Sequence, residues 1–201
     1  CCGRMANRWF RAAAADALAG KIAAVVTAPL NKESLHASGE SLPGHTEILA
    51  EVCGNIVEPC MLFWSPEMVL SLVTIHTSLQ SVPGLLTVDG VLQKLRLTHQ
   101  TARQIYGAPV TIGLLGLNPH AGENGLFGDE EQRILIPAME AAQAEGIETA
   151  GPLVPDTAFV RKELPYRAYV ALYHDQGLIP FKMRAFDTGV NVTVGLPVVR
   201  T

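Results

Sequence analysis

Apolar residues recur with helical spacing in three long stretches, at residues 5–19, 87–106 and 130–144. The first stretch ends at Gly20 and the third stops just before Gly146, and glycine is common beyond a helix end. The middle stretch is typical of an amphipathic helix, so we expect three of its polar side chains to point outward: Gln93, Lys94 and Arg96.

Two shorter helices are predicted in the first third of the chain. The turn Ala28–Lys32 leads into one that stops at Gly39. The other runs to about Cys53. Thr46 is placed to cap it, and Glu47 lies in its first turn, where a carboxylate is favourable.

Short apolar runs predict strands between these helices, and runs without polar residues are typical of strands buried on both faces of a sheet. Four of them are Ile22–Thr27, Val110–Leu117, Val170–Tyr173 and Val190–Val194. Met61–Trp64 and Met68–Ile75 form a hairpin-like pair around Ser65–Pro66. The alternation of helices and strands predicts an α/β protein with a mixed sheet, folded continuously.

Composition narrows the class of protein. The chain is 48% hydrophobic and 17% charged, so it can bury a sizeable core. A net charge of −4 gives no basic surface for nucleic acid, and no apolar run reaches the roughly 18 residues of a membrane span. The four cysteines match neither a zinc ribbon nor a disulfide framework, and no signal peptide is evident. We expect a cytoplasmic protein with no nucleic-acid or membrane partner.

Both ends of the chain interrupt the pattern. The chain opens within a helical stretch, and it stops at residues 196–201, directly after a strand and a turn. Chains more often end on a docked or frayed element. We therefore expect residues 1–201 to be a partial catalytic chain, truncated at both ends, that covers the central region of a longer protein.

Three of the six histidines follow strand-like runs. His76 closes an apolar run, His120 follows the next run and a short turn, and His174 ends a third run. Loops at the carboxyl ends of parallel strands form the ligand crevice of α/β proteins, and three imidazoles suit zinc and other first-row metals. Each could instead be an ordinary hydrogen-bonded histidine. The shared position of all three favours a metal-centred active site.

The segment Pro43–Glu47 is a turn that leads into a helix start. Free N–H groups and the helix dipole make such a start suitable for an anion such as phosphate. His45 and the Thr46 hydroxyl could add hydrogen bonds to that anion or to a substrate hydroxyl. Thr46 could equally be only a cap.

The glycine-rich segment Gly116–Gly125 lacks both the GxGxxG pattern of dinucleotide sites and the lysine of a phosphate-binding P-loop. Its glycines allow the backbone to approach a ligand closely. Glu123 could orient His120 through a hydrogen bond, or it could be a solvated loop carboxylate.

Further polar residues follow the third histidine. Asp175 could hold a ligand imidazole or accept a proton, and Lys182 could exchange protons or bind phosphate, unless it is a plain surface lysine. Asn191 and Arg200 flank the last strand. Because Arg200 ends an apolar segment where an unpaired charge is costly, an anionic partner is expected there.

Six motifs, in order along the chain, resemble the 4-hydroxythreonine-4-phosphate dehydrogenase family of vitamin B6 synthesis. They are Thr27–Lys32, Pro43–Glu47, Gly116–Glu123, Gly151-Pro152 with Asp156-Thr157, Tyr173–Gly177 and Gly189–Pro197. The resemblance implies an isocitrate/isopropylmalate dehydrogenase-like fold with mixed sheets flanked by helices. It also implies a homodimer whose active site is shared between domains and subunits.

The resemblance further implies a reaction and the residues that carry it. A divalent metal (Zn, Mg or Co) and NAD or NADP would support oxidation and decarboxylation of 4-phosphohydroxy-L-threonine to an amino ketone phosphate. The metal ligands would be His76, His120 and His174, and the catalytic residues Asp175 and Lys182. The substrate would contact His45, Thr46, Lys182, Asn191 and Arg200.

The chain also departs from the family pattern. Residues 77–83 carry Gln80 where pyridoxine-pathway members commonly have a Pro-Leu-Arg sequence, and a Ser-Val-Asp-His-Gly-Thr-Ala stretch on the cofactor side is absent. Two alternatives therefore stay open, a related dehydrogenase of phosphothreonate or phosphoerythronate and a non-catalytic metal- or ligand-binding fragment. A metal-dependent hydrolase or aldolase is disfavoured, because no well-placed nucleophile or carboxylate pair accompanies the histidines.

Overall fold

The computed structural model describes residues 2–42, 44–54 and 59–200, and the chain divides into two compact units. Unit 1 combines the residues up to Pro59 with those from Thr193 onward, and unit 2 is Cys60–Val192. The hydrophobic pattern indicates no boundary at these points, so the division is a difference from the continuous fold expected from sequence.

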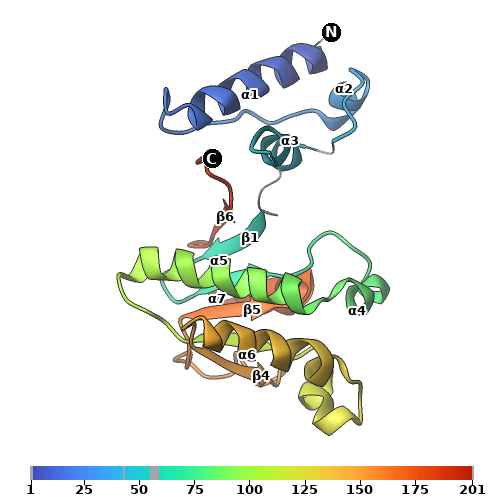
Figure 1. Cartoon of the computed structure of the whole chain (residues 1–201), viewed down its shortest axis with the longest axis vertical. Coiled ribbons are helices and arrows are strands. Elements are labelled where there is room, and N and C mark those ends of the chain that lie inside the picture. The colour runs from blue at the N-terminus through green and yellow to red at the C-terminus, as the bar shows by residue number, and fades with distance from the viewer. Residues whose placement is uncertain (1, 43, 55–58, 201) are drawn as a thin grey trace. The chain divides into compact units, whose positions relative to one another are not determined.

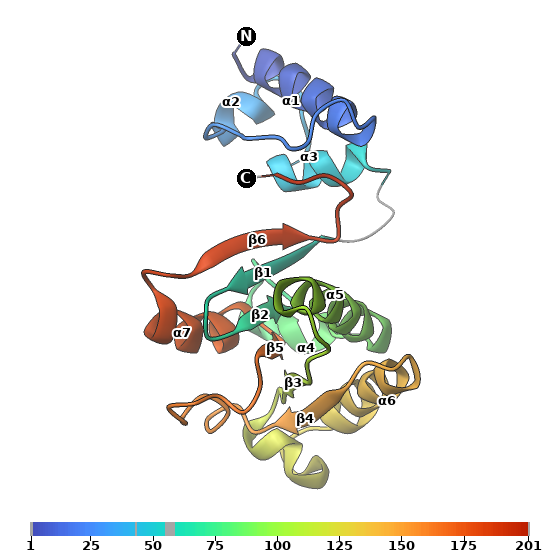
Figure 2. The same ribbon diagram turned by 90° about the vertical axis from the view of Figure 1, so that its left-hand side faces the viewer.

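Unit 2 (Figure 1) is organised by a mixed sheet with the strand order β4-β3-β5-β2-β1-β6, which can be followed by the labels in Figure 2. The last two residues of β6, Thr193 and Val194, belong to unit 1. The strands are β1 (Cys60–Trp64), β2 (Val69–Leu72), β3 (Ile112–Leu115), β4 (Thr149–Leu153), β5 (Ala168–Ala171) and β6 (Val190–Val194). β1 and β2 form the expected antiparallel pair, whereas β2, β5, β3 and β4 run parallel to one another. The carboxyl ends of these four parallel strands therefore lie along one edge of the sheet.

Helices cover both faces of this sheet (Figure 2). α7 (His174–Ala185) lies on one side, with α5 (Val88–Tyr106) and α6 (Ile136–Ala144) on the other. Alternate strand residues face α7 and form a buried core with it, among them Leu70, Leu72 and Tyr169. On the opposite face, the Ser71 Oγ and Thr98 Oγ1 of α5 share a hydrogen bond of 2.5 Å. The remaining helices are the short α4 (Val82–Leu85), the 3-10 turns Leu79–Ser81 and Pro119–Gly125, and the π turn Glu131–Leu135.

The long helix α5 has clear local signals at both ends. The Thr87 side chain accepts a hydrogen bond from the Gly90 N–H, and the helix ends at Gly107, whose φ is 69°. The outward position expected for Lys94 is wrong, because its exposed fraction is only 3%. α5 packs against the sheet and also against α6, so a wider part of its surface is covered than the apolar stripe alone indicates.

Besides short helical turns, one strand and one long helix of unit 2 were not predicted from the sequence, β4 and α7. β4 contains Gly151 and Pro152, residues that are more typical of a loop than of a strand interior. α7 contains Gly177 and Pro180, which interrupt the helical pattern. Gly177 is needed for close packing, because a Cβ there would lie 2.9 Å from side-chain atoms of Leu70, Leu72 and Ala171.

Unit 1 contains α1 (Cys2–Leu18), α2 (Lys32–His36) and α3 (His45–Val52). Its core includes Phe10, Leu35, Ile48 and Leu49. The strand expected at Ile22–Thr27 is wrong: only Val25 makes a bridge, with Arg200, and the neighbouring Val26 is 82% exposed. Across the described ranges, no helix is both long and apolar enough to cross a membrane.

The start of α3 also differs from expectation. The N-cap is Gly44, and no side chain caps the helix there. Thr46 is the second residue of the helix, so its role as the cap is wrong, whereas Glu47 does lie in the first turn. Pro43, the first residue of the motif predicted at this start, lies outside the described residues.

Candidate metal and substrate site

The three histidines singled out from the sequence all follow parallel strands at the same edge of the sheet in unit 2. His76 comes after β2, His174 directly begins α7 after β5, and His120 comes after β3. Because β5 lies between β2 and β3, His174 belongs to the central position of the three. The strand-end arrangement expected from the sequence is therefore present.

Backbone pairing beyond the strands brings His76 and His174 together. The Val73 N–H donates to the Ala171 carbonyl at 2.9 Å, and the Thr74 N–H donates to the Leu172 carbonyl at 3.1 Å. The Thr74 hydroxyl adds a 2.7 Å hydrogen bond to that same carbonyl. The two imidazole ring centroids are 5.8 Å apart, and both rings line a pocket of about 600 Å³.

The geometry of this pair fits two ligands of one metal ion. At nitrogen–zinc distances of about 2.0–2.1 Å, two imidazoles that share an ion have ring centres roughly 5–6 Å apart. The His174 Nδ1 lies 2.6 Å from the Asp175 Oδ1, which leaves Nε2 for a ligand bond. Metal-binding histidines commonly donate their second N–H to a carboxylate in this way.

A third ligand is not placed beside this pair. Among the described residues, no group of three histidine, cysteine, aspartate or glutamate side chains is close enough to hold an ion. His120 is exposed and lines a different hollow of about 440 Å³, with Ala121, Glu123 and Asn124. A single chain thus brings His76 and His174 together and places His120, the third expected ligand, on a separate loop.

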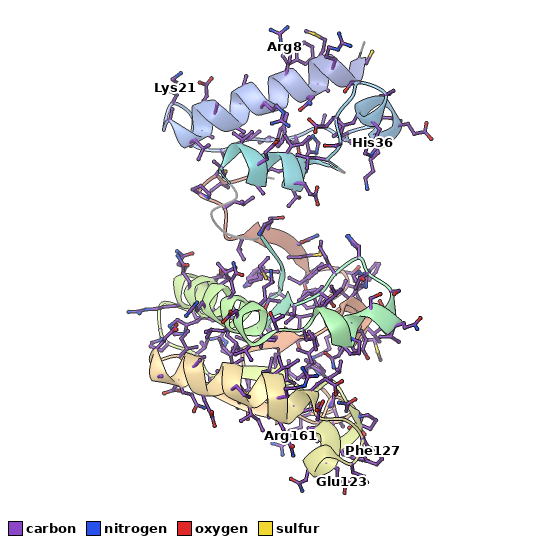
Figure 3. The ribbon with its side chains drawn as sticks, turned by 45° about the vertical axis from the view of Figure 1, so that its right-hand side comes forward. Arg8, Lys21, His36, Glu123, Phe127 and Arg161 are labelled. Carbon is purple, nitrogen blue, oxygen red and sulfur yellow. The ribbon has the colours of Figure 1, made fainter. Side chains whose placement is uncertain are left out.

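The loop of His120 has an unusual backbone. His120 has a φ of 53°, and the next four residues, Ala121 to Asn124, also have positive φ values. Glu123 is exposed at the outer end of this loop, near Phe127 (Figure 3). No hydrogen bond joins Glu123 to His120 among the described contacts, so the orienting role considered for this carboxylate has no geometric support.

A glutamine connects the two strand ends. The Gln176 Oε1 accepts from the Leu172 N–H at 2.7 Å, and its Nε2 donates to the Gly116 carbonyl at 2.7 Å. One side chain therefore ties the segment that leads to His174 to the start of the loop that carries His120. Sequence reasoning missed this role, although Gln176 belongs to the Tyr173–Gly177 motif.

Unit 1 holds a second pocket, of about 390 Å³, lined by Thr27, Lys32, His45 and Arg200 among others. Two guanidinium nitrogens of Arg200 donate to the Thr27 Oγ1 at 3.1 and 3.0 Å. A third contact joins Arg200 to the His45 Nδ1 at 3.4 Å. Lys32 and Arg200 are two cationic side chains in the lining of this pocket, and they favour an anionic ligand.

The surroundings of His45 in this pocket set its protonation state. Burial, followed by the charge of Arg200, lowers the pKa of His45 from its ordinary value of 6.5. His45 is therefore neutral near pH 7 and can accept the Arg200 hydrogen bond. Thr27 and Lys32 were not singled out as site residues, although the Thr27–Lys32 motif contains both.

The remaining expected site residues are not assembled around either pocket. Thr46 is half-buried in the first turn of α3 in unit 1. In unit 2, Lys182 is exposed on α7 and Asn191 is exposed on β6. Neither lines the pocket of His76 and His174.

Known proteins resemble the chain over nearly all of its length. A 4-hydroxythreonine-4-phosphate dehydrogenase from Trichlorobacter lovleyi is 47% identical over 99% of this chain and 60% of its own length. A D-threonate 4-phosphate dehydrogenase from Pectobacterium atrosepticum is 42% identical over 99% of this chain and 61% of its own length.

A solved structure agrees with these relatives in fold. The crystal structure of 4-hydroxythreonine-4-phosphate dehydrogenase from Klebsiella pneumoniae superposes with a TM-score of 0.88 at 44% identity. The match covers 98% of this chain and 60% of that one. The chain thus spans about 60% of the length of the relatives it matches. The model of the family described as pyridoxal phosphate biosynthetic protein PdxA matches residues 1–201, and the chain belongs to that family.

Proposed function

We propose that the protein containing this chain is an NAD(P)- and divalent-metal-dependent dehydrogenase that oxidises and decarboxylates 4-phosphohydroxy-L-threonine. The relatives named 4-hydroxythreonine-4-phosphate dehydrogenase support this reaction. The observation in this chain that carries the proposal is the His76–His174 pair, with Asp175 bonded to His174. The product would be an amino ketone phosphate for pyridoxal phosphate synthesis.

In this proposal, His76 and His174 hold the metal from one chain and His120 supplies the third ligand. Because His120 lines a separate hollow, a shared site in a homodimer accounts for the third imidazole better than one chain does. A bound divalent ion would polarise the substrate hydroxyl, and NAD or NADP would accept the hydride. Asp175 keeps the His174 ring oriented with its Nε2 toward the ligand position.

We assign the charged part of the substrate to the pocket of Arg200. Its guanidinium is already fixed by Thr27, so little side-chain freedom is lost when it binds an anion. Neutral His45 adds a hydrogen bond without a second full charge, and Thr46 lies one residue further along the same helix start. Lys182 and Asn191 complete the proposed substrate contacts, and Lys182 is the proposed proton-exchanging residue.

A related substrate is the second candidate. The Pectobacterium relative named D-threonate 4-phosphate dehydrogenase is 42% identical to this chain. Gln80 lies in the exposed 3-10 turn Leu79–Ser81, next to Ser78 and Leu79, which line the pocket of His76 and His174. Because Gln80 stands where pyridoxine-pathway members commonly have a charged residue, this end of the pocket is where the preference between the two substrates would be set.

Steady-state assays of the full-length protein test the proposal and separate the two candidates. The substrates to compare are 4-phosphohydroxythreonine, phosphothreonate and phosphoerythronate, each with NAD and NADP. We expect the highest kcat/KM for 4-phosphohydroxythreonine and loss of turnover when a chelator is added. A preference for phosphothreonate would select the second candidate, and turnover of none of the three would contradict both.

A further inference from the structure

A buried carboxylate, that of Glu131, is hydrogen-bonded to the loop that carries His120. Glu131 is the first residue of the π turn before α6, and its exposed fraction is 3%. Burial of a carboxylate is costly unless hydrogen bonds replace its water. The structure supplies three such bonds, and all of their donors belong to the segment that leads to His120.

The donors show what Glu131 holds in place. Its Oε1 accepts from the backbone N–H groups of Leu117 and Asn118, at 2.7 and 2.8 Å. Its Oε2 accepts from the Asn118 side-chain amide at 2.9 Å. Both N–H groups lie within three residues of His120, so the carboxylate fixes the backbone immediately before the histidine.

The far side of the loop also closes over Glu131. A Cβ on Gly122 would lie only 2.7 Å from the Glu131 Oε2, so the loop needs a glycine at this position. Gly122 has a φ of 81° within the run of positive φ values that begins at His120. Such conformations are unfavourable for residues other than glycine and persist where the surrounding structure holds them.

We infer that Glu131 is a positioning residue for His120, acting through the backbone of Leu117 and Asn118. No hydrogen bond joins Glu131 to the imidazole among the described contacts, and we assign it no part in the chemistry. The inference rests on the proposed function in one respect, that His120 binds the metal. The sequence suggested Glu123 for this role, but Glu123 is exposed and has no hydrogen bond to His120 among the described contacts.

The variant Glu131→Gln tests the inference with little change in shape. Glutamine keeps one oxygen for the backbone N–H groups but turns its NH₂ toward the Asn118 amide, so that two donors face each other. Glu130→Gln is the matched control. It removes the same charge one residue earlier, where Glu130 is only partly buried and accepts a single bond, from the Asn118 side chain at 2.8 Å.

Two measurements on the full-length protein are needed. Hydrogen exchange reports the order of residues 117–126 without any metal. Titration with Co²⁺ gives the metal affinity, and its visible absorption reports the ligand geometry. For Glu131→Gln we expect faster exchange in this segment, a roughly 10–100-fold weaker Co²⁺ affinity and an altered spectrum. Glu130→Gln should behave as the wild type does, and equal effects of the two variants would contradict the inference.

His120→Ala separates this inference from the proposed function. If His120→Ala leaves the Co²⁺ affinity unchanged, His120 is not a ligand and the metal assignment fails, whatever Glu131 does. If His120→Ala weakens binding but Glu131→Gln changes neither exchange nor affinity, the positioning role is wrong. Should Glu131→Gln fail to fold, Glu131→Asp decides, because it keeps the charge but draws the carboxylate one methylene away from the Leu117 and Asn118 N–H groups. Unchanged exchange and affinity in that variant would also overturn the inference.

Discussion

The pair His76–His174 and the loop of His120 occupy the same edge of one sheet but are held in different ways. The pair sits on two strand ends that are joined by main-chain hydrogen bonds at Val73 and Thr74. His120 lies on a left-handed turn, and the backbone N–H groups just before this turn donate to the side chain of Glu131. Regular backbone pairing therefore fixes two of the expected ligands, whereas the third depends on individual side chains.

This difference indicates which changes should damage the site most. Main-chain pairing survives most substitutions, so the pair is lost mainly when an imidazole itself is removed. The loop can fail through residues that never touch a ligand, since its conformation depends on side-chain contacts at its base.

Removal of one member of the pair should have the largest effect. In the full-length protein, we expect His174→Ala to lower kcat by more than about 100-fold, because a direct ligand matters more than a residue that only orients one. kcat should fall more steeply than substrate affinity, as for an interaction made mainly in the transition state. His36→Ala, an exposed histidine on α2, is the control. Normal turnover of His174→Ala in the presence of a chelator would end the metal mechanism.

The pocket of unit 1 provides a comparison with no histidine pair. There we expect Arg200→Ala to raise the KM for the phosphorylated substrate by about 10–150-fold, the equivalent of about 1.5–3 kcal/mol for a charged hydrogen bond. The effect on kcat should be smaller. Arg96→Ala is the control, since Arg96 is exposed and pairs with Glu145 on the surface. An unchanged KM would remove Arg200 from the substrate site.

Gln176 links the two regions, so Gln176→Met sharpens the comparison. The change keeps the size of the side chain but leaves the Leu172 N–H and the Gly116 carbonyl without their partner. We expect the free energy of unfolding to fall by about 1–3 kcal/mol, measured by urea denaturation. Gln104→Met, at an exposed position of α5, should have little effect. Equal stability of the two variants would show that the link contributes nothing.

The smallest expected effect concerns the titration of His45, followed by NMR. Because the charge of Arg200 contributes to the lowered pKa of His45, Arg200→Ala should raise that pKa toward 6.5. In the unchanged protein the folded state binds this proton less readily than the unfolded chain. Unfolding therefore takes up a proton, and His45 lowers stability as the pH falls below 6.5. A pKa that does not move in Arg200→Ala would show that burial alone sets it.

Elements with an uninterrupted pattern could be predicted from the sequence. The β1–β2 hairpin, α5 and β6 lie where hydrophobic spacing places them. The hairpin and α5 do so because each buries an apolar face, whereas β6 keeps the expected bounds although its side chains are exposed or half-buried. β4 and α7 could not be predicted, since glycine and proline occupy their interiors and only tertiary packing shows why. The strand expected at Ile22–Thr27 failed for the opposite reason: most of its residues are apolar, but only Val25 forms a β-bridge among the described residues.

The candidate site, like the fold, could be predicted only in part. His76, His120 and His174 each follow a strand-like run, and the carboxyl ends of parallel strands lie along one edge of a sheet. The sequence therefore could place all three histidines at that edge. It could not show that two of them meet and one does not, since the lengths and backbone angles of the loops decide that. Glu131 and Gln176 were also beyond prediction, because their partners are main-chain groups more than ten residues away or on another strand end.

The Leu172 carbonyl accepts two hydrogen bonds from a single residue, Thr74, and this detail affects how an ion would be bound and released. The two segments that carry His76 and His174 are joined by these hydrogen bonds, so in the proposed site the pair would be preorganised as a bidentate chelator. An arriving ion loses little affinity to the ordering of these groups. In the proposed site, the ion would bind this pair first and His120 last, and its release would begin with detachment from His120.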